Sequence, residues 1–288
     1  MRKIKKKTMI IASIILIVLI TALSIYVHFE NKKIDVSEIY VNDSNIPKEF
    51  NNFKIMQISD LHNSVFGENN QDLIDVVIKN SPDIIVITGD IIDSYHPDVD
   101  ISVDFIKQIQ NYAPIYYVNG NHEYRLTEEY AEFKSKIINF NVTVLENSQT
   151  VINKNGAKID ILGVNDPTFS YLYGYTDDET NLNNYLDSLD YSSDNYKILL
   201  SHRPEKFELY CNHNLNLVFC GHAHGGQIRI PYIGGLYAPH QGLFPKYTSG
   251  IYNKGNTNMI VSRGLRNRSF PARINNNPEV VIAILKSK

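Results

Sequence analysis

The chain has 288 residues, of which 43% are hydrophobic, so it can bury a substantial core in one large domain or two small ones. The formal net charge is -3, but five of the 28 basic residues precede the first acid: Arg2, Lys3, Lys5, Lys6 and Lys7. The rest of the chain, with 23 basic against 31 acidic residues, has a formal charge of -8. This surplus of acid argues against a nucleic-acid binder that uses a broad basic face, so we expect no nucleic-acid partner.

The N-terminal segment predicts a membrane anchor. Residues 9–27 contain no charged side chain, and about 20 apolar residues span a bilayer as a helix. The basic cluster ahead of them should stay in the cytoplasm, so everything after Phe29 should lie on the outer face. We therefore expect residues 1–29 to form a basic N-terminus and a single-pass transmembrane helix in the cell membrane. A cleaved signal peptide is the alternative, since Ala22-Leu23-Ser24 offers small residues, although the apolar run is long for a signal core.

Beyond the anchor, the hydrophobic pattern predicts alternating strands and helices. Residues 30–50 form a polar connector with a first short strand at 39–41. Strands are expected next at residues 53–58, 84–88 and 115–118, and helices at 71–79, 99–110 and 128–139. This alternation predicts a layered α/β fold with an interior sheet.

The second half of the chain is richer in strands. They are expected at residues 142–145, 150–152, 159–164, 197–200, 217–219, 227–230, 259–261 and 280–285. Short turns join several of them, as in an antiparallel sheet, so we expect a second sheet packed on the first. The polar residues lie in loops at strand ends, where sites on such folds are usually found.

Five segments with metal-ligand side chains occur in order along the chain, most of them directly after a predicted strand. They are Asp60-Leu61-His62, Gly89-Asp90, Gly120-Asn121-His122-Glu123, Ser201-His202 and Gly221-His222-Ala223-His224. Residues two apart in an extended segment point to the same side, so each of the pairs in the first and last segments should bind one ion. Asp90 can bridge two cations with its two carboxylate oxygens. Each motif alone is weak, but the ordered set predicts a site for two divalent metals.

At these residues the chain resembles the calcineurin-like metallophosphoesterase superfamily, whose pattern is D-x-H, G-D-x-x-D, G-N-H-E, H and G-H-x-H. The resemblance covers residues 53–285 and implies a catalytic domain at residues 51–288. The implied fold is a four-layer α/β/β/α sandwich of two mixed sheets flanked by helices. Two overlapping ligand sets are implied: Asp60, His62, Asp90 and His224 for one metal, and Asp90, Asn121, His202 and His222 for the other.

The same resemblance implies roles for two further residues. His122 would stabilise the transition state or protonate the leaving oxygen, and Asp93 would orient this histidine and raise its pKa. The alternative for Asp93 is an ordinary residue at a helix start. Two divalent cations against two carboxylates leave a charge of about +2, which attracts a phosphate ester. Because imidazoles outnumber carboxylates, Mn, Fe or Zn is favoured over Ca.

The residues around this pattern narrow the branch of the superfamily. Ser94-Tyr95 stands where serine/threonine protein phosphatases carry Arg-Gly, which argues against that branch. Residues 225–229, 237–239 and 242–247 resemble a bacterial membrane-associated subgroup, often grouped with UDP-2,3-diacylglucosamine pyrophosphatase-like phosphodiesterases. Arg266 departs from the glycine common in that subgroup.

The resemblance therefore favours a phosphodiesterase or pyrophosphatase that acts on a small or lipid-linked phosphorylated substrate at the outer membrane face. A phosphomonoesterase is one alternative, and a metal-binding scaffold without catalysis is another. Arg229 could bind the substrate phosphate or be a surface arginine. The loop at residues 231–244, rich in Gly, Tyr and Phe, could face lipid or simply pack over the site.

Overall fold

Two six-stranded sheets form the body of the protein in the computed structural model, which describes residues 2–266 and 273–288, with side chains from Lys7 onward. In spatial order the first sheet contains β1 (Asp35–Asp43), β16 (Glu279–Ser287), β2 (Lys54–Ile58), β3 (Ile84–Thr88), β4 (Ile115–Val118) and β5 (Thr143–Val144). The second contains β14 (Gly250–Lys254), β15 (Thr257–Val261), β9 (Leu217–Cys220), β8 (Tyr196–Leu200), β7 (Ala157–Gly163) and β6 (Ser148–Lys154). Two short hairpins follow the last metal motif: β10 (Arg229–Ile230) with β11 (Gly234–Gly235), and β12 (Tyr237–Ala238) with β13 (Gly242–Leu243).

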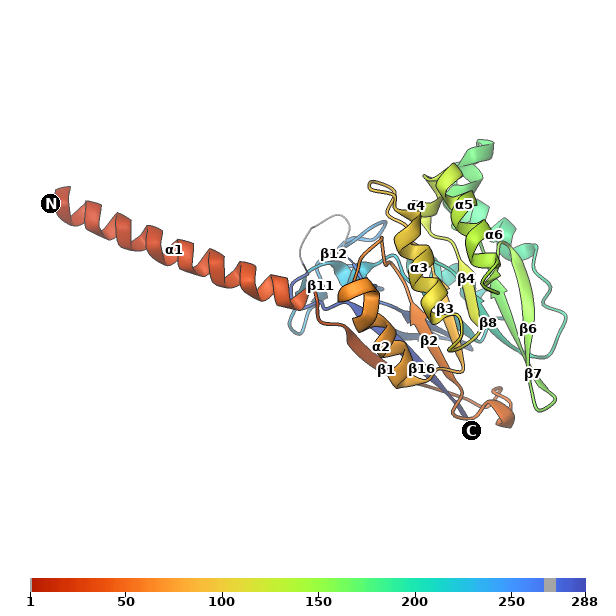
Figure 1. Cartoon of the computed structure of the whole chain (residues 1–288). Helices are drawn as coiled ribbons and strands as arrows, with labels where there is room; N and C mark the ends of the chain where they lie inside the picture. Colours follow the sequence, from red (N-terminus) through yellow and green to blue (C-terminus); the bar gives the residue numbers. More distant parts are fainter. Residues whose placement is uncertain (1, 267–272) are drawn as a thin grey trace.

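Helices flank both sheets (Figure 1). The α-helices are α1 (Arg2–Glu30), α2 (Gln71–Asn80), α3 (Val99–Ile109), α4 (Asn121–Tyr124), α5 (Thr127–Ile138), α6 (Asp178–Asp187) and α7 (Phe207–Cys211). Short 3-10 helices lie at Lys48–Phe50, Glu68–Asn70, Pro167–Tyr173, Pro204–Lys206 and His224–Gly226.

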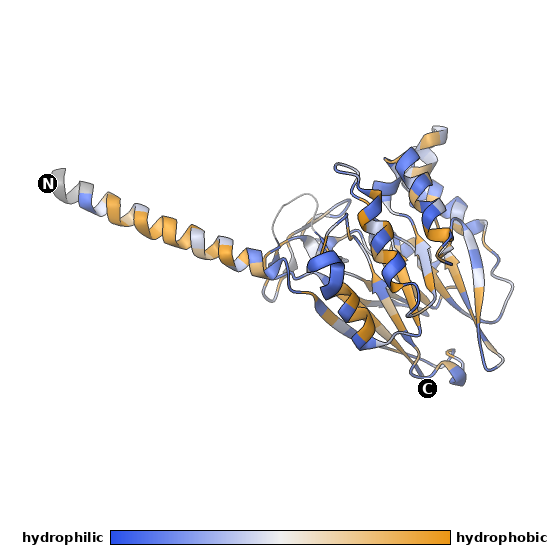
Figure 2. Cartoon of the chain, viewed as in Figure 1, coloured by the Kyte–Doolittle hydropathy of each residue, from blue (hydrophilic) through white to orange (hydrophobic). Residues whose placement is uncertain are grey.

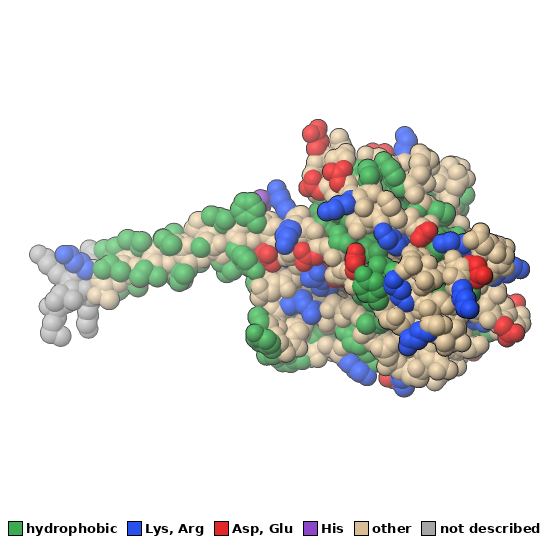
Figure 3. Space-filling model, turned by 90° about the horizontal axis from the view of Figure 1, so that it is seen from below, with side chains coloured by type: hydrophobic (Ala, Val, Ile, Leu, Met, Phe, Trp, Pro, Cys, Tyr) green, Lys and Arg blue, Asp and Glu red, His purple; other side chains and the backbone are tan. Residues whose placement is uncertain are grey.

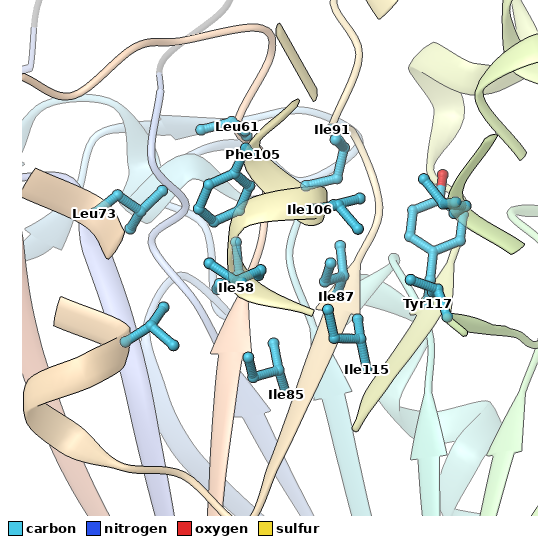
Figure 4. Close-up of a cluster of buried hydrophobic side chains, with 14 of the residues drawn as sticks. Ile58, Leu61, Leu73, Ile85, Ile87, Ile91, Phe105, Ile106, Ile115 and Tyr117 are labelled. Carbon is cyan, nitrogen blue, oxygen red and sulfur yellow. The ribbon is translucent and has the colours of Figure 1, made fainter. Parts of the chain in front are cut away.

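Three apolar clusters show that the layers are stacked as helix, sheet, sheet, helix. Along β3, Ile85 and Ile87 face the cluster under α2, α3 and α5, whereas Ile84 and Val86 face the second sheet. This period of two, with both faces buried, explains the continuous apolar run in the sequence. Figure 4 shows the first cluster, with Phe105 of α3 packed over the strands. The third cluster lies between the second sheet and helices α6 and α7. The predicted four-layer fold of two mixed sheets is confirmed.

The antiparallel pairing expected for several strands of the second half holds only at the edges of the second sheet. The neighbouring pairs β7–β8, β8–β9 and β9–β15 are parallel, and only the edge pairs β6–β7 and β14–β15 are antiparallel. Parallel neighbours need a crossover connection, and α6 and α7 lie in two of these connections. The sequence analysis missed α6 because it buries only two apolar side chains, Leu182 and Leu186, among polar residues.

The last strand also belongs to a different sheet from the one expected. β16 lies in the first sheet, parallel to β1 and antiparallel to β2. The pairing of β1 with β16 runs from Asp35 to Asp43, so the connector after the anchor contributes an edge strand to the domain.

Helix α1 projects away from the body, apolar along most of its length (Figures 1 and 2). Its segment Lys7–Glu30 is long and apolar enough to cross a membrane, and its side chains are largely exposed (Figure 3). The C-terminal end of the helix contacts the domain, because the Tyr26 hydroxyl donates to Asn275 Oδ1 at 2.9 Å. The backbone N–H of Arg273 likewise donates to Asn31 Oδ1 at 2.9 Å.

Candidate metal centre

The five sequence motifs follow the carboxyl ends of five strands. Asp60 and His62 follow β2, Asp90 follows β3, and Asn121 follows β4, three parallel neighbours in the first sheet. The other two motifs follow β8 and β9, parallel neighbours in the second sheet. Because the carboxyl ends of parallel strands meet at one edge, the packing of the two sheets brings all five loops together.

The sequence analysis assumed an extended backbone at the first and last motifs, but the backbone there is not extended. Asp60, His62, Asp90, His222 and His224 all have positive φ, between 46° and 66°. Their side chains converge because each loop turns sharply, and not because of strand alternation. Left-handed non-glycine residues cost about 1–2 kcal/mol each and persist where the surroundings hold them. Here the N–H of Asp60 donates to Gly89 O and the N–H of His62 donates to Asp90 O, both at 3.1 Å.

Of the four groups of potential ligand atoms among the described residues, two share the carboxylate of Asp90. One group contains Asp60, His62, Asp90 and His224, and the other contains Asp90, His202 and His222. Within each group the ligand atoms lie within 4.8 Å of one another, and all six residues of the two groups are buried. Asn121 lies beside Asp90, since the next backbone N–H, that of His122, donates to Asp90 Oδ1 at 2.8 Å.

Hydrogen bonds select the ring nitrogens that face the centre. Nδ1 of His202 lies 2.7 Å from the carbonyl oxygen of Thr88, and Nδ1 of His224 lies 2.6 Å from that of Arg266. A carbonyl oxygen only accepts, so Nδ1 carries a proton in both rings, which leaves Nε2 as the nitrogen that can bind a metal. Nε2 faces the carboxylates in both rings: that of His202 lies 3.2 Å from Asp90 Oδ2, and that of His224 lies 3.6 Å from Asp60 Oδ1. Carbonyl acceptors orient metal-binding histidines in this way.

Buried ligand atoms without hydrogen-bond partners, together with the charge at the site, fit divalent cations. Both ring nitrogens of His62 and Oδ1 of Asn121 are buried without a hydrogen-bond partner among the described residues, which is rare for buried polar atoms. Burial lowers the pKa of His62 well below its usual value, which leaves a neutral ring. Burial would also lower the pKa of His202, but the charge of Asp90 and its neighbours raises it to about 10. The surrounding carboxylates therefore favour a positive charge at this position.

Comparison with known proteins identifies the family. A family model described as calcineurin-like phosphoesterase matches residues 53–226, which include every predicted metal ligand. The chain belongs to the calcineurin-like phosphoesterase family. It is a metal-dependent phosphoesterase, as the sequence motifs predicted.

The relatives of this phosphoesterase come from bacteria and animals. An uncharacterized metallophosphoesterase of Bacillus subtilis, YkuE, is 32% identical over 268 residues, which cover 90% of this chain and 88% of the relative. The phosphodiesterase YaeI of Escherichia coli is 27% identical and covers 80% of this chain and 81% of its own. A transmembrane protein with metallophosphoesterase domain from Bos taurus is 29% identical, over 88% of this chain and 57% of the relative.

In this phosphoesterase the ring of His122 packs edge-on against His62, with 4.5 Å between ring centroids. Asp93 was expected to orient His122, but its Oδ1 lies 3.9 Å from Nδ1, beyond hydrogen-bonding distance. Instead the backbone N–H of Ser94 donates to Nδ1 at 3.1 Å, and the Ser94 hydroxyl lies at 2.9 Å. Burial lowers the pKa of His122 overall, although the charges of Asp90 and Asp93 act in the raising direction. With Nδ1 accepting, the neutral ring carries its proton on Nε2.

Glu123 links the loop after β3 to the loop after β4 by hydrogen bonds. It is fully buried and accepts backbone N–H bonds from Asp90 and Gly120 at Oε2, and from Ile91 and Ile92 at Oε1. Burial and the charge of Asp90 raise its pKa to about 7. The sequence analysis gave Glu123 no role, although it belongs to the G-N-H-E motif.

A close approach of two backbones also holds these loops. Gly89 has φ +86°, and a Cβ there would lie 2.6 Å from the backbone nitrogen of Gly120. We predict that Gly89→Ala lowers the free energy of unfolding by roughly 1–3 kcal/mol and weakens metal retention, because it pushes apart the loops that carry Asp90 and Asn121. Urea unfolding of both proteins measures the first effect. Gly156→Ala, at a turn with similar φ and open space, is the matched control for strain without a clash.

The sequence analysis gave His240 no role, but it lies against the second ligand group. Its Nδ1 lies 3.0 Å from Nε2 of His222 and 2.9 Å from Nη1 of Arg203. Arg203 is itself buried and forms a bidentate ion pair with Asp166, at 2.5 and 2.9 Å. Sequence offered no signal, because His240 lies in an irregular loop after β12.

We predict that His240→Ala weakens the binding of one of two metals by about 10–100-fold, the usual effect of removing a group that orients a ligand. Metal content after dialysis against graded chelator concentrations measures this effect. His213→Ala is the control, since that histidine contacts Leu209 O and Asp187. Equal metal retention in the two variants would contradict the orienting role.

Arg229 lies on β10, three residues after the end of the 3-10 helix that contains His224. Its Nη1 donates to Gly225 O at 2.9 Å and to Thr248 Oγ1 at 3.3 Å. These contacts hold the loop that follows His224. A contact between Arg229 and a substrate phosphate stays a prediction.

Proposed function

We propose that this phosphoesterase is a phosphodiesterase or pyrophosphatase that acts on a small or lipid-linked substrate at the outer face of the cell membrane. The observation that carries the proposal is the membership of Asp90 in both ligand groups, which suits a pair of cations with one bridging carboxylate. The curated relative YaeI, named a phosphodiesterase, supports the choice of diester over monoester.

Two divalent transition-metal ions, Mn, Fe or Zn, would occupy the centre. The proposed ligands are Asp60, His62, Asp90 and His224 for one ion, and Asp90, Asn121, His202 and His222 for the other. When bound, the two ions would supply Lewis-acid chemistry to the attacking and leaving oxygens of an in-line displacement. Buried imidazoles with few carboxylates favour these metals over Ca.

His122 would act on the leaving group. Because the Ser94 N–H donates to Nδ1, the neutral ring can donate a hydrogen bond from Nε2 to the departing oxygen, whereas proton transfer to that oxygen would need the imidazolium form. Asp93, whose charge favours the protonated ring, would assist through space. Arg229 would assist substrate binding after a local change of its present contacts.

The membrane part of the proposal rests on α1 and on the surface at its base. In a single-pass arrangement, the basic N-terminus would stay in the cytoplasm and the catalytic domain would lie outside. Asn275 bonds both Tyr26 of the helix and the carbonyl oxygen of Arg229. The turn that follows β10 exposes Tyr232 and Ile233 beside this contact, where an aromatic and an aliphatic side chain suit a lipid interface.

The catalytic proposal is tested with the full chain in detergent, stripped with chelator and reloaded with Mn, Fe or Zn. We expect about two metal ions per chain and faster hydrolysis of bis-p-nitrophenyl phosphate than of p-nitrophenyl phosphate. The chelated protein is the control and should be inactive. A clear monoester preference would instead identify a phosphomonoesterase, and failure to retain metal would contradict the proposed centre.

The topology is tested separately by adding protease to intact spheroplasts that contain the full chain. We expect the catalytic domain to be digested without permeabilising the membrane, while a cytoplasmic marker protein survives. Digestion only after permeabilisation would place the domain inside the cell. Release of an intact domain without protease would indicate a cleaved signal instead of an anchor.

A further inference from the structure

A cavity of about 700 Å³ lies between the end of α1 and the loop that carries Asp60 and His62. Its described lining comes from the residues after α1, from the segment after His62, and from the strand-end segments before and after residues 267–272. The lining residues used below are Lys32, Asn63, Asp72, Arg266 and Arg273. No ligand of the metal centre is among the described lining residues, so the cavity lies beside that centre.

The cavity is positively charged. Three cationic side chains, Lys32, Arg266 and Arg273, line it against one carboxylate, Asp72, which gives a formal charge of +2. Such a surplus at the wall of a concave surface attracts anions.

Arg273 provides the strongest sign of a missing anion. It is 2% exposed, and its Nη1 and Nη2 donate only to the carbonyl oxygens of Gly264 and Arg263. Its Nε is buried without a hydrogen-bond partner among the described residues, and no described carboxylate forms an ion pair with it. Burial, together with the charge of Arg263, lowers the pKa of Arg273 to about 9. The carboxylates of Asp60 and Glu279 act on Arg273 only through space, so its buried charge has no ion-pair partner among the described residues. Such a charge is unfavourable, and residues 267–272 contain no acid that could supply a partner.

Arg266 connects this cavity to the catalytic centre. Its Nη1 donates to His62 O at 2.8 Å and lies 3.9 Å from Asp93 Oδ2. Its backbone is fixed to both loops of the first ligand group, because its N–H donates to Asp60 O and its carbonyl oxygen accepts from His224. A substrate cleaved at the metal centre therefore lies next to a side chain that also lines the cavity.

We propose that this cavity binds a second phosphate group of the substrate, beyond the phosphate that is cleaved, through Arg266 and Arg273. The inference rests on the proposed phosphodiester or pyrophosphate hydrolysis and narrows the substrate to molecules with two anionic groups. Guanidinium groups suit this role because their fork of donors matches phosphate oxygens. Since Asn31 and Lys32 directly follow α1, the cavity opens near the membrane surface, so the second phosphate could belong to a soluble compound or to a lipid headgroup.

Phosphate binding to the metal-free full chain tests the proposal without relying on catalysis. The chain is placed in phosphatidylcholine nanodiscs, and labelled inorganic phosphate is titrated by equilibrium dialysis. We expect Arg266→Gln and Arg273→Gln each to bind phosphate about tenfold more weakly than the wild type. The matched control Lys158→Gln removes an exposed charge on β7 and should bind normally. Equal affinity in all four proteins, or no binding by the wild type, overturns the proposal.

Two further arms separate the remaining possibilities. Arg266→Gln removes a half-exposed side chain, so its result stands even if Arg273→Gln fails to fold, and melting curves of all variants reveal such a failure. Nanodiscs that contain phosphatidic acid distinguish the sources. Competition with inorganic phosphate identifies a lipid phosphate as the occupant, and unchanged phosphate affinity identifies a soluble one.

Activity measurements distinguish failure of this inference from failure of the proposed function. Both proteins are loaded with metal, and kcat/KM is measured for a pyrophosphate-linked substrate and for bis-p-nitrophenyl phosphate. We expect the ratio of the first value to the second to be about tenfold lower in Arg266→Gln than in the wild type, because KM for the pyrophosphate-linked substrate rises. An unchanged ratio with active enzyme overturns the cavity assignment alone. If the metal-loaded wild type hydrolyses neither substrate but phosphate binding still depends on the two arginines, the proposed function is overturned and the proposed binding site is supported.

Discussion

Asp90→Asn is expected to lower kcat for bis-p-nitrophenyl phosphate by at least about 10³-fold, because Asp90 lies in both groups of ligand atoms. The substitution keeps the size of the side chain but removes a negative charge that the two proposed cations would share. The N–H of His122 now donates to Asp90 Oδ1, and an amide nitrogen in that position could not accept it. Metal content, measured by elemental analysis of the same samples, should fall together with kcat.

The matched control for Asp90→Asn is Asp75→Asn, which removes the same charge from the exposed face of α2. Its kcat and metal content should equal those of the wild type. Retention of both metals and full activity by Asp90→Asn would remove the basis for the proposed centre, whatever the substrate.

His122→Ala is expected to lower kcat by about 10²–10⁴-fold while leaving metal content near that of the wild type. His122 lies beside the first ligand group, 4.5 Å from His62 between ring centroids, but outside both groups that share Asp90. If His122 donates a proton from Nε2, the loss should grow as the leaving group becomes more basic. A series of diesters with nitrophenyl, phenyl and methyl leaving groups measures this dependence.

Ser94→Ala is the companion variant for His122. It removes the hydroxyl near Nδ1 but keeps the backbone N–H that donates to the ring, so we expect a much smaller loss of kcat. Loss of metal from His122→Ala, or an equal loss of kcat for every leaving group, would show that His122 acts structurally and not on the leaving oxygen.

The sequence predicted the elements best where one physical signal dominates. The strands at 84–88 and 115–118 have the predicted bounds, because both faces of these strands are buried and the apolar run is unbroken. Helix α6 was missed, since its two buried leucines are too few to produce a helical pattern. The sheet to which β16 belongs was also missed, because an apolar run does not indicate which strands it pairs with.

At the candidate centre, the sequence predicted the side chains but not how they are held. The positive φ of Asp60 and His222 depends on hydrogen bonds from other loops, which no local pattern encodes. Ser94 and not Asp93 bonds to Nδ1 of His122, at 3.1 Å against 3.9 Å. The turn after β3 sets this small difference in distance. His240 approaches His222 through a loop without periodicity.

The sequence by itself determined which ligand types this protein carries and the order in which strand ends present them, because hydrophobic periodicity and motif spacing are local properties of the chain. Only the tertiary structure decided that the ligand loops turn with positive φ and that Arg273 lines a cavity without an ion-pair partner among the described residues. Both depend on how two sheets and the base of α1 pack together. Such distances between residues remote in sequence follow from packing, which the local pattern constrains but does not specify.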